Sequence, residues 1–194
     1  MNAIETFEVG GLTVKIYPDE DAESPREWDN VSKFAFQHRR YDLPWEVDDN
    51  LKGLSLQELH DELVDQGAVI ILKVYGYDHG IFTISAESFY GRAHHAEWDS
   101  GVIGLACVFR DDLLKDHNRR HLSNKLVTLA TLNLKAEIKE YDQFLTGDVY
   151  GYVVEDQEGN NLESCWGFYG LDYCKEEARA VAESVAKTVF DPAI

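Results

Sequence analysis

Two loops of this sequence place histidines close to carboxylates, a combination found in metal sites and in acid–base catalysts. Asp78-His79 lies in a turn between two expected strands, and His94-His95 and Asp99 lie in the long loop that follows. Because the two loops flank neighbouring strands, these side chains could meet and bind a divalent metal. Their spacing matches no ligand signature, however, and exposed loop histidines explain them better. We therefore expect no bound metal and no cofactor, and keep the five residues as an alternative metal site.

The side chains able to act as nucleophiles lie in unfavourable settings. No serine stands in a GxSxG elbow. Cys165 lies inside an aromatic strand, where the usual role of cysteine is that of a small buried hydrophobe. Cys174 begins a helix, a position that can lower a thiol pKa, but Glu176 and Glu177 beside it act in the opposite direction. We therefore assign no catalytic residue.

The charge balance is the strongest signal in the composition. The chain has 36 Asp and Glu against 18 Lys and Arg, a formal net charge of −18. Such a field repels nucleic acid and anionic membranes and attracts cationic surfaces, although a solvated acidic face without a partner explains the same number. No Lys or Arg lies between Lys139 and Lys175. The candidate partner-binding acids are Asp148, Glu155, Asp156, Glu158 and Glu163 from this stretch, with Asp19, Glu20, Asp21 and Glu23 as a second patch.

Length and composition indicate one ordinary domain, residues 1–194, with 44% hydrophobic residues to form its core. The three cysteines form no CxxC pair, which favours a reducing cytosol over a disulfide framework. The N-terminal segment has neither the basic nor the apolar region of a signal peptide. No apolar run approaches the roughly 18–20 residues that cross a bilayer. We expect a cytoplasmic protein.

Hydrophobic periodicity predicts strands that mostly come in adjacent pairs. Two strands are expected within residues 4–17 and others at residues 33–38, 68–77, 81–85, 101–109 and in the hairpin 148–169. Helices are expected from a capping box at Ser55 to Gly67, over residues 121–145, and after Asp172 as a cap. Residues 18–30, rich in acids and proline, are expected to form a surface loop without regular structure.

This order of elements predicts an α+β fold, a single domain with a mainly antiparallel sheet and helices packed on one face. A doubly wound parallel sheet would require strict alternation of strands and helices. The aromatic hairpin of residues 148–169 is expected at the centre of the sheet, since aromatic side chains suit its half-buried face. The helix of residues 121–145, with a single apolar stripe, is expected to pack across one face of it.

Several short segments together resemble a family of small proteins encoded by bacteriophages and other mobile elements. They are EWDN, HRRY, YDHG and WDSG, followed by YDQFLTGDVYGYVVED and SCWGFYG. The similarity extends from about Trp28 to Tyr173, and the final third is its most specific part. The resemblance implies a small cytosolic protein made inside a bacterium, and it brings no enzymatic activity.

The charge and the resemblance together favour a binding protein over an enzyme, and three hypotheses follow from them. The first is an acidic inhibitor of a host DNA-targeting defence system, of restriction or CRISPR type, that occupies a basic nucleic-acid channel as a mimic. Its partner would be a host protein with a basic nucleic-acid-binding surface, with no direct binding to nucleic acid or membrane. The second is a small metal-dependent or nucleotide-handling phage enzyme that uses the histidine loops. The third is an accessory protein whose host partner is unrelated to DNA. The sequence does not indicate the oligomeric state.

Overall fold

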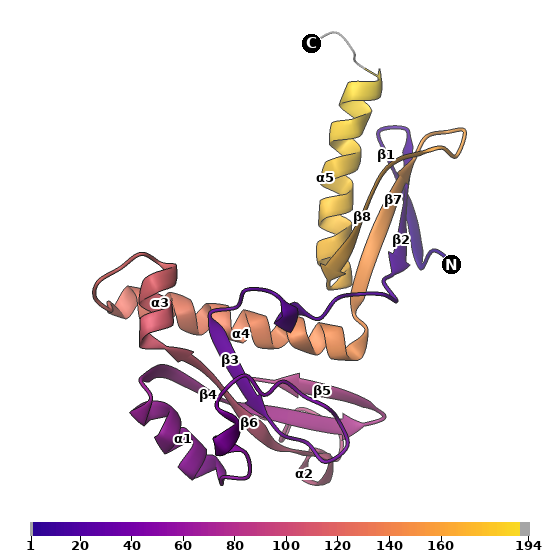
Figure 1. Ribbon diagram of the computed structural model, residues 1–194. Coiled ribbons are helices and arrows are strands. Elements are labelled where there is room, and N and C mark those ends of the chain that lie inside the picture. The colour runs from indigo at the N-terminus through magenta and orange to yellow at the C-terminus, as the bar shows by residue number, and fades with distance from the viewer. Residues whose placement is uncertain (1, 191–194) are drawn as a thin grey trace. The chain divides into compact units, whose positions relative to one another are not determined.

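The computed structural model describes residues 2–190 and divides into two compact units (Figure 1). Unit 1 joins the two ends of the chain, Met1–Ser24 and Gln143–Ile194, and unit 2 is the continuous segment Pro25–Asp142. Each unit has its own four-stranded antiparallel sheet and its own helices. The α+β class and the antiparallel pairing predicted from the sequence are therefore confirmed, and the strands are shared between two sheets.

Unit 1 is a four-stranded sheet with one helix along it. Its strands lie in the order β1-β2-β7-β8, and every neighbouring pair is antiparallel. Helix α5 follows the last strand and runs along one face of the sheet (Figure 1). The bounds are β1 (Glu5–Val9), β2 (Leu12–Pro18), β7 (Val149–Glu155), β8 (Asn161–Tyr169) and α5 (Leu171–Phe190).

Alternation along β2 and β7 builds the core of unit 1. The apolar side chains of one sheet face meet a stripe of small residues on α5, and small side chains let a helix approach a sheet closely. The buried members of this core are Leu12, Val14, Ile16, Tyr152, Val154, Cys174, Ala178 and Ala182. Asp172, expected to cap the last helix, is instead the second residue of α5. The opposite sheet face carries the alternate residues of the strands.

Unit 2 contains the second sheet, with strand order β3-β6-β4-β5. Its strands are β3 (Ser32–Phe36), β4 (Ala68–His79), β5 (Ile81–Ser85) and β6 (Ser100–Phe109). Its helices are α1 (Leu56–Asp65), α2 (Ala96–Asp99), α3 (Arg110–Asp116) and α4 (Asn124–Thr146, up to Asp142 in this unit). Two 3-10 turns, η1 (Pro25–Glu27) and η2 (Asp49–Leu51), complete it.

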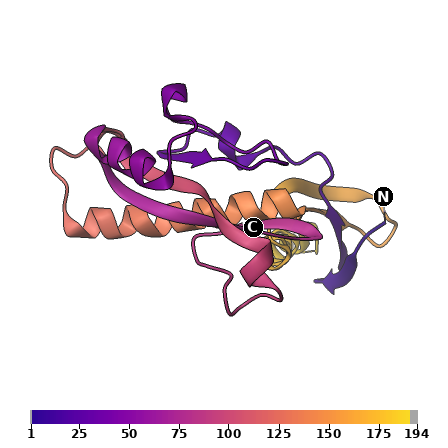
Figure 2. The ribbon, with the colours of Figure 1, turned by 90° about the horizontal axis from the view of Figure 1, so that it is seen from below.

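Helices cover both faces of the sheet in unit 2. The Ser55 capping box starts α1 as predicted, and Leu59 and Leu63 of α1 pack with Ala35 on one face. On the other face, Phe34 meets Tyr141 of α4 edge-on, with ring centroids 6.0 Å apart. Successive residues of a strand point to opposite faces, so α1 and α4 cover opposite sides of β3 (Figures 1 and 2).

The aromatic hairpin pairs in a sheet as predicted, but its position and its covering helix differ from the expectation. β7 is an inner strand and β8 forms one edge of the sheet. The helix packed on it is α5, whereas α4, the helix predicted for residues 121–145, packs in unit 2 on Phe34. Both helices have an apolar stripe, and periodicity alone does not indicate which sheet a stripe will cover.

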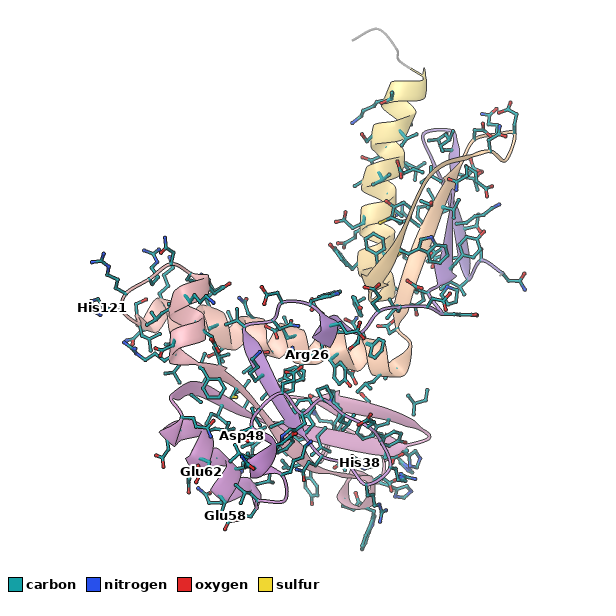
Figure 3. All side chains as sticks on the ribbon, viewed as in Figure 1. Arg26, His38, Asp48, Glu58, Glu62 and His121 are labelled. Atoms are coloured by element: carbon teal, nitrogen blue, oxygen red, sulfur yellow. The ribbon has the colours of Figure 1, made fainter. Side chains whose placement is uncertain are left out.

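The segment predicted to be a loop without regular structure contributes Arg26, the centre of a buried polar network in unit 2. Pro25 is buried, and Arg26 of η1 lies beside α4 with a side chain only 6% exposed (Figure 3). The Arg26 guanidinium binds both oxygens of Glu46, at 2.9 and 2.7 Å, and Glu137 Oε2 at 2.8 Å. It also donates to Ser32 O at 3.0 Å and stacks 3.8 Å from the Phe34 ring centroid. Composition pointed to a solvated loop because the partner acids lie 20 and 111 residues away.

Candidate functional site

The acidic charge is concentrated in unit 1. This unit has 16 Asp and Glu against 4 Lys and Arg, a difference of −12, whereas unit 2 has 20 against 14, a difference of −6. Two thirds of the excess charge therefore belongs to 76 of the 194 residues. All nine acids predicted to bind a partner belong to unit 1.

The second predicted patch, segment 19–23, lies next to the Asp148 end of the first one. The other acids of the first patch, from Glu155 to Glu163, lie toward the hairpin turn at the opposite end of β7 and β8. The Asp19 N–H donates to Val149 O at 2.9 Å, so residue 19 continues the pairing of β2 with β7. The Asp19 carboxylate accepts a hydrogen bond from the Gly167 N–H at 3.0 Å. The Tyr169 hydroxyl donates to Glu23 O at 2.5 Å. The acidic segment 19–23 is thus fastened along the end of β8.

Four of the nine predicted acids stabilise unit 1 itself. Glu155 forms an ion pair with Lys15 at 2.6 Å. Asp148 accepts a hydrogen bond from Gln143 Nε2 at 3.1 Å, and Asp19 accepts the one from the Gly167 N–H. Asp156 caps the hairpin turn, accepting from Asn160 Nδ2 and N at 2.8 Å each and from Glu158 N at 3.0 Å. Hydrogen bonds from Asn160 lower the pKa of Asp156 below its ordinary value. These carboxylates are already engaged within the unit.

The remaining five acids are exposed and form the candidate binding surface, which we call the acidic surface of unit 1. Its residues are Glu20, Asp21, Glu23, Glu158 and Glu163. Glu20, Asp21 and Glu23 are supplied by the segment after β2, Glu158 by the hairpin turn and Glu163 by β8. None of these five carboxylates has an ion pair to a Lys or Arg among the described residues. Their charge therefore faces solvent uncompensated.

An exposed aromatic pair lies beside the acidic surface. Trp166 of β8 is 43% exposed, and its ring lies 6.1 Å from that of Tyr17. The indole covers Gly151, where an added Cβ would collide with the ring. Tyr17 alternates with buried Ile16, so this pair is on the sheet face opposite α5. Trp and Tyr dominate binding hot spots. The sequence analysis did not identify this pair; the signal that could have found it is a glycine opposite a tryptophan across the hairpin.

The edge strand β8 is unusually open to solvent. Its first seven residues, 161–167, are all exposed, and they include Cys165, which was predicted to be buried. The prediction was wrong because it treated the hairpin as the centre of the sheet, whereas β8 has a neighbour on one side only. An edge strand leaves backbone N–H and C=O groups free for a partner. The aromatic pair and the last residues of β8 lie beside the acidic segment 19–23, whereas Glu163 and Glu158 lie at the hairpin-turn end of β8.

The histidine loops of unit 2 come together as the sequence suggested, with one exception. His79 Nδ1 lies 2.8 Å from Asp99 Oδ2, and the His94 and His95 rings are 3.9 Å apart, each 6.1 Å from His79. Asp78 follows strand alternation to the other side, where it contacts Arg40 and accepts from Tyr41 at 3.2 Å. Within residues 2–190, no three His, Cys, Asp or Glu side chains are arranged to hold a metal ion.

The start of a helix can lower a thiol pKa, but the pKa of Cys174 is raised in the folded protein. Cys174 is fully buried in the core of unit 1, and burial raises its thiol pKa to about 11. Burial likewise raises the pKa of Cys107 to about 12. The effect of a helix N-terminus on Cys174 is outweighed because the side chain points into the apolar core rather than toward solvent.

Comparison of the chain with protein-family models, curated proteins and solved structures gives no match. The resemblance to mobile-element proteins thus remains a prediction from the sequence. None of the helices within residues 2–190 combines the length and the apolar character that crossing a membrane requires.

Proposed function

We propose that this protein binds a partner protein through the acidic surface of unit 1 and blocks the partner's basic nucleic-acid-binding site. The observation that carries the proposal is the concentration of a −12 charge difference in unit 1. A merely solubilising charge needs no such concentration, because any exposed position serves solubility equally well.

The chemistry of the surface favours a protein as the target. Uncompensated carboxylates repel phosphates and are attracted to rows of Lys and Arg, which nucleic-acid-binding proteins present to the backbone. The Trp166–Tyr17 pair adds the flat aromatic contact that charge alone lacks. In such an interface the carboxylates would accelerate association with the partner and set specificity, and the aromatic pair would slow dissociation of the complex.

The resemblance to phage and mobile-element proteins supplies the biological context of the proposal. A mobile element inside a bacterium meets nucleases that recognise its DNA through basic channels. We place the protein in the bacterial cytoplasm as an inhibitor of such a restriction or CRISPR-type nuclease. Competition for the channel would require neither catalysis nor a cofactor.

Charge reversal tests this proposal. The variant Glu20→Lys/Glu158→Lys/Glu163→Lys changes the net charge from −18 to −12 and leaves the internally bonded acids intact. A matched control, Glu62→Lys/Asp65→Lys/Glu97→Lys, makes the same charge change at exposed positions of unit 2 (Glu62 is labelled in Figure 3). Exposed substitutions usually change stability by less than about 0.5 kcal/mol, so both variants should fold.

The readout is plasmid cleavage by a panel of purified restriction and CRISPR nucleases at several salt concentrations. We expect the protein to inhibit at least one nuclease, and inhibition to weaken as salt rises, because long-range attraction between exposed charges is screened. The unit 1 variant should lose inhibition and the unit 2 control should retain it. Equal inhibition by all three proteins, or no inhibition of any nuclease, would show that the charge only aids solubility or that the partner is unrelated to DNA.

A further inference from the structure

Unit 2 contains a cavity of about 580 Å³ that the function proposed above does not use. It lies between β5, the segment 86–93 and the second half of α4, all within Pro25–Asp142. Pockets of roughly 300–1,000 Å³ with an apolar wall and a few convergent polar groups are typical small-molecule sites. The side chains around this cavity define the chemistry of a ligand.

Two lysines of α4 supply unpaired positive charge at the cavity. Lys135 and Lys139 are four residues apart, so they lie one above the other on the same helix face. Both are exposed, and neither has a hydrogen bond or an ion pair with any described residue. Both ammonium groups are therefore available to an anion at the cavity.

A third cation is held in position at the same cavity. Arg92 donates from Nε to Ser88 O at 2.8 Å and from Nη2 to Glu87 O at 3.0 Å. These backbone contacts fix the guanidinium in the loop without cancelling its charge, and its ion pair with Glu87 is long at 3.4 Å. Arg92 therefore presents a preorganised positive group to the cavity.

The other carboxylate of the lining is already committed. Asp142 accepts from Thr83 Oγ1 at 2.5 Å and from the Ile84 N–H at 2.7 Å. These two hydrogen bonds join α4 to β5, so the Asp142 carboxylate binds β5 and not the two lysines. The lysines are thus left to meet an anion from solution.

One wall of the cavity is aromatic and apolar. Phe89 stacks on Tyr77 with ring centroids 5.3 Å apart and planes at 26°. The Tyr77 hydroxyl donates to His94 O at 2.9 Å, which holds this ring in place. Ile84 and Ile138 are buried below. A flat, aromatic ligand could stack on this wall while its charged end reaches the lysines.

We infer that this cavity binds a nucleoside monophosphate, with its phosphate at Lys135, Lys139 and Arg92 and its base on the Phe89–Tyr77 wall. Ammonium and guanidinium groups are the usual phosphate partners, and every nucleobase has a face suited to stacking. The aromatic wall selects a nucleotide over a bare anion. This binding is independent of the partner protein proposed for unit 1.

Calorimetry with adenosine monophosphate, adenosine and inorganic phosphate tests the inference. We expect saturable binding of the nucleotide, and at least a tenfold weaker affinity for adenosine and for phosphate, because each probe uses only one part of the site. Lys135→Ala/Lys139→Ala should weaken nucleotide binding at least tenfold. Lys125→Ala, an exposed lysine on the same helix outside the cavity, is the matched control and should leave it unchanged.

Amide spectra of the labelled protein locate the site. Addition of the nucleotide should shift resonances of residues 83–93 and 135–142 and not those of unit 1. Phe89→Leu should weaken binding of the nucleotide and leave binding of phosphate unaltered. The inference is overturned if no saturable binding occurs at millimolar nucleotide, if phosphate binds as tightly as the nucleotide, or if Lys125→Ala weakens binding as much as the double variant.

Discussion

Replacement of Arg26 by methionine should strongly destabilise unit 2. The change keeps an apolar stem of similar length over Phe34 but removes five donors that now meet Glu46, Glu137 and Ser32. Burial disfavours the charged form of Arg26, yet the hydrogen bonds and charges of Glu46 and then Glu137 raise its pKa above the ordinary value. The cation is therefore held by two carboxylates that lose their counter-ion in the variant.

The expected cost follows from how buried the three groups are. Breaking a buried ion pair from one side typically costs about 3–5 kcal/mol, because a charge is left without a partner. The side chains of Glu46 and Glu137 are 22% and 21% exposed, so water can partly solvate them after the change. This places the expected loss near the lower end, about 3 kcal/mol. Arg26→Lys should lose less, since one ammonium can meet one carboxylate but not grip both oxygens of Glu46.

Urea unfolding of a Trp166→Phe background provides the assay. The three remaining tryptophans, Trp28, Trp45 and Trp98, all belong to unit 2, so fluorescence then reports this unit alone. The control is Arg110→Ala, whose ion pair with Asp111 is on the surface and should contribute at most about 1 kcal/mol. Adding Glu46→Gln and Glu137→Gln to the methionine variant should recover part of the loss. A loss below about 1 kcal/mol for Arg26→Met would refute the reasoning that the network is a buried charge cluster.

Three further predictions concern single groups. At pH 8 a disulfide reagent should modify Cys165 rapidly and the two buried thiols only after unfolding; three fast thiols would contradict the described cores. Hydrogen bonds from Ser55 lower the pKa of Glu58 in the folded protein. Their contribution to the stability of the fold is therefore present above the pKa that Glu58 has in the unfolded chain, and it is lost as the pH falls through its pKa in the folded protein. The stability difference between the wild type and Ser55→Ala should therefore shrink from pH 7 to pH 3, and a constant difference would argue against it. Gly151→Ala should displace the Trp166 ring and red-shift its emission in a protein with this tryptophan alone; unchanged emission would disprove the contact.

Local patterns in the sequence were sufficient to identify most individual elements. Period-two alternation located β2 and β7 because a strand presents one face to the core. The capping box at Ser55 is a contact between residues three apart, and it forms as predicted. The acidic candidates could likewise be found, since the absence of Lys and Arg between residues 139 and 175 is visible in the chain itself.

Contacts between distant residues decided what the sequence alone could not. The division into two sheets depends on pairing β2 with β7, about 140 residues later, and no local pattern encodes that choice. Arg26 was read as a loop residue because its partners Glu46 and Glu137 approach only after β3 and α4 pack together. Position in the sheet likewise decided that Cys165 is exposed.

The candidate sites divide in the same way. Sequence composition determined that the protein is acidic and which stretches are free of Lys and Arg. The tertiary structure decided which carboxylates remain free. Asp156 accepts hydrogen bonds within its own turn and Glu155 forms an ion pair with Lys15, whereas Glu158 and Glu163 are exposed to solvent. Charge is a property of residue types and can be counted along a chain. Availability for binding depends on which partner each charge meets, and only folding brings those partners together.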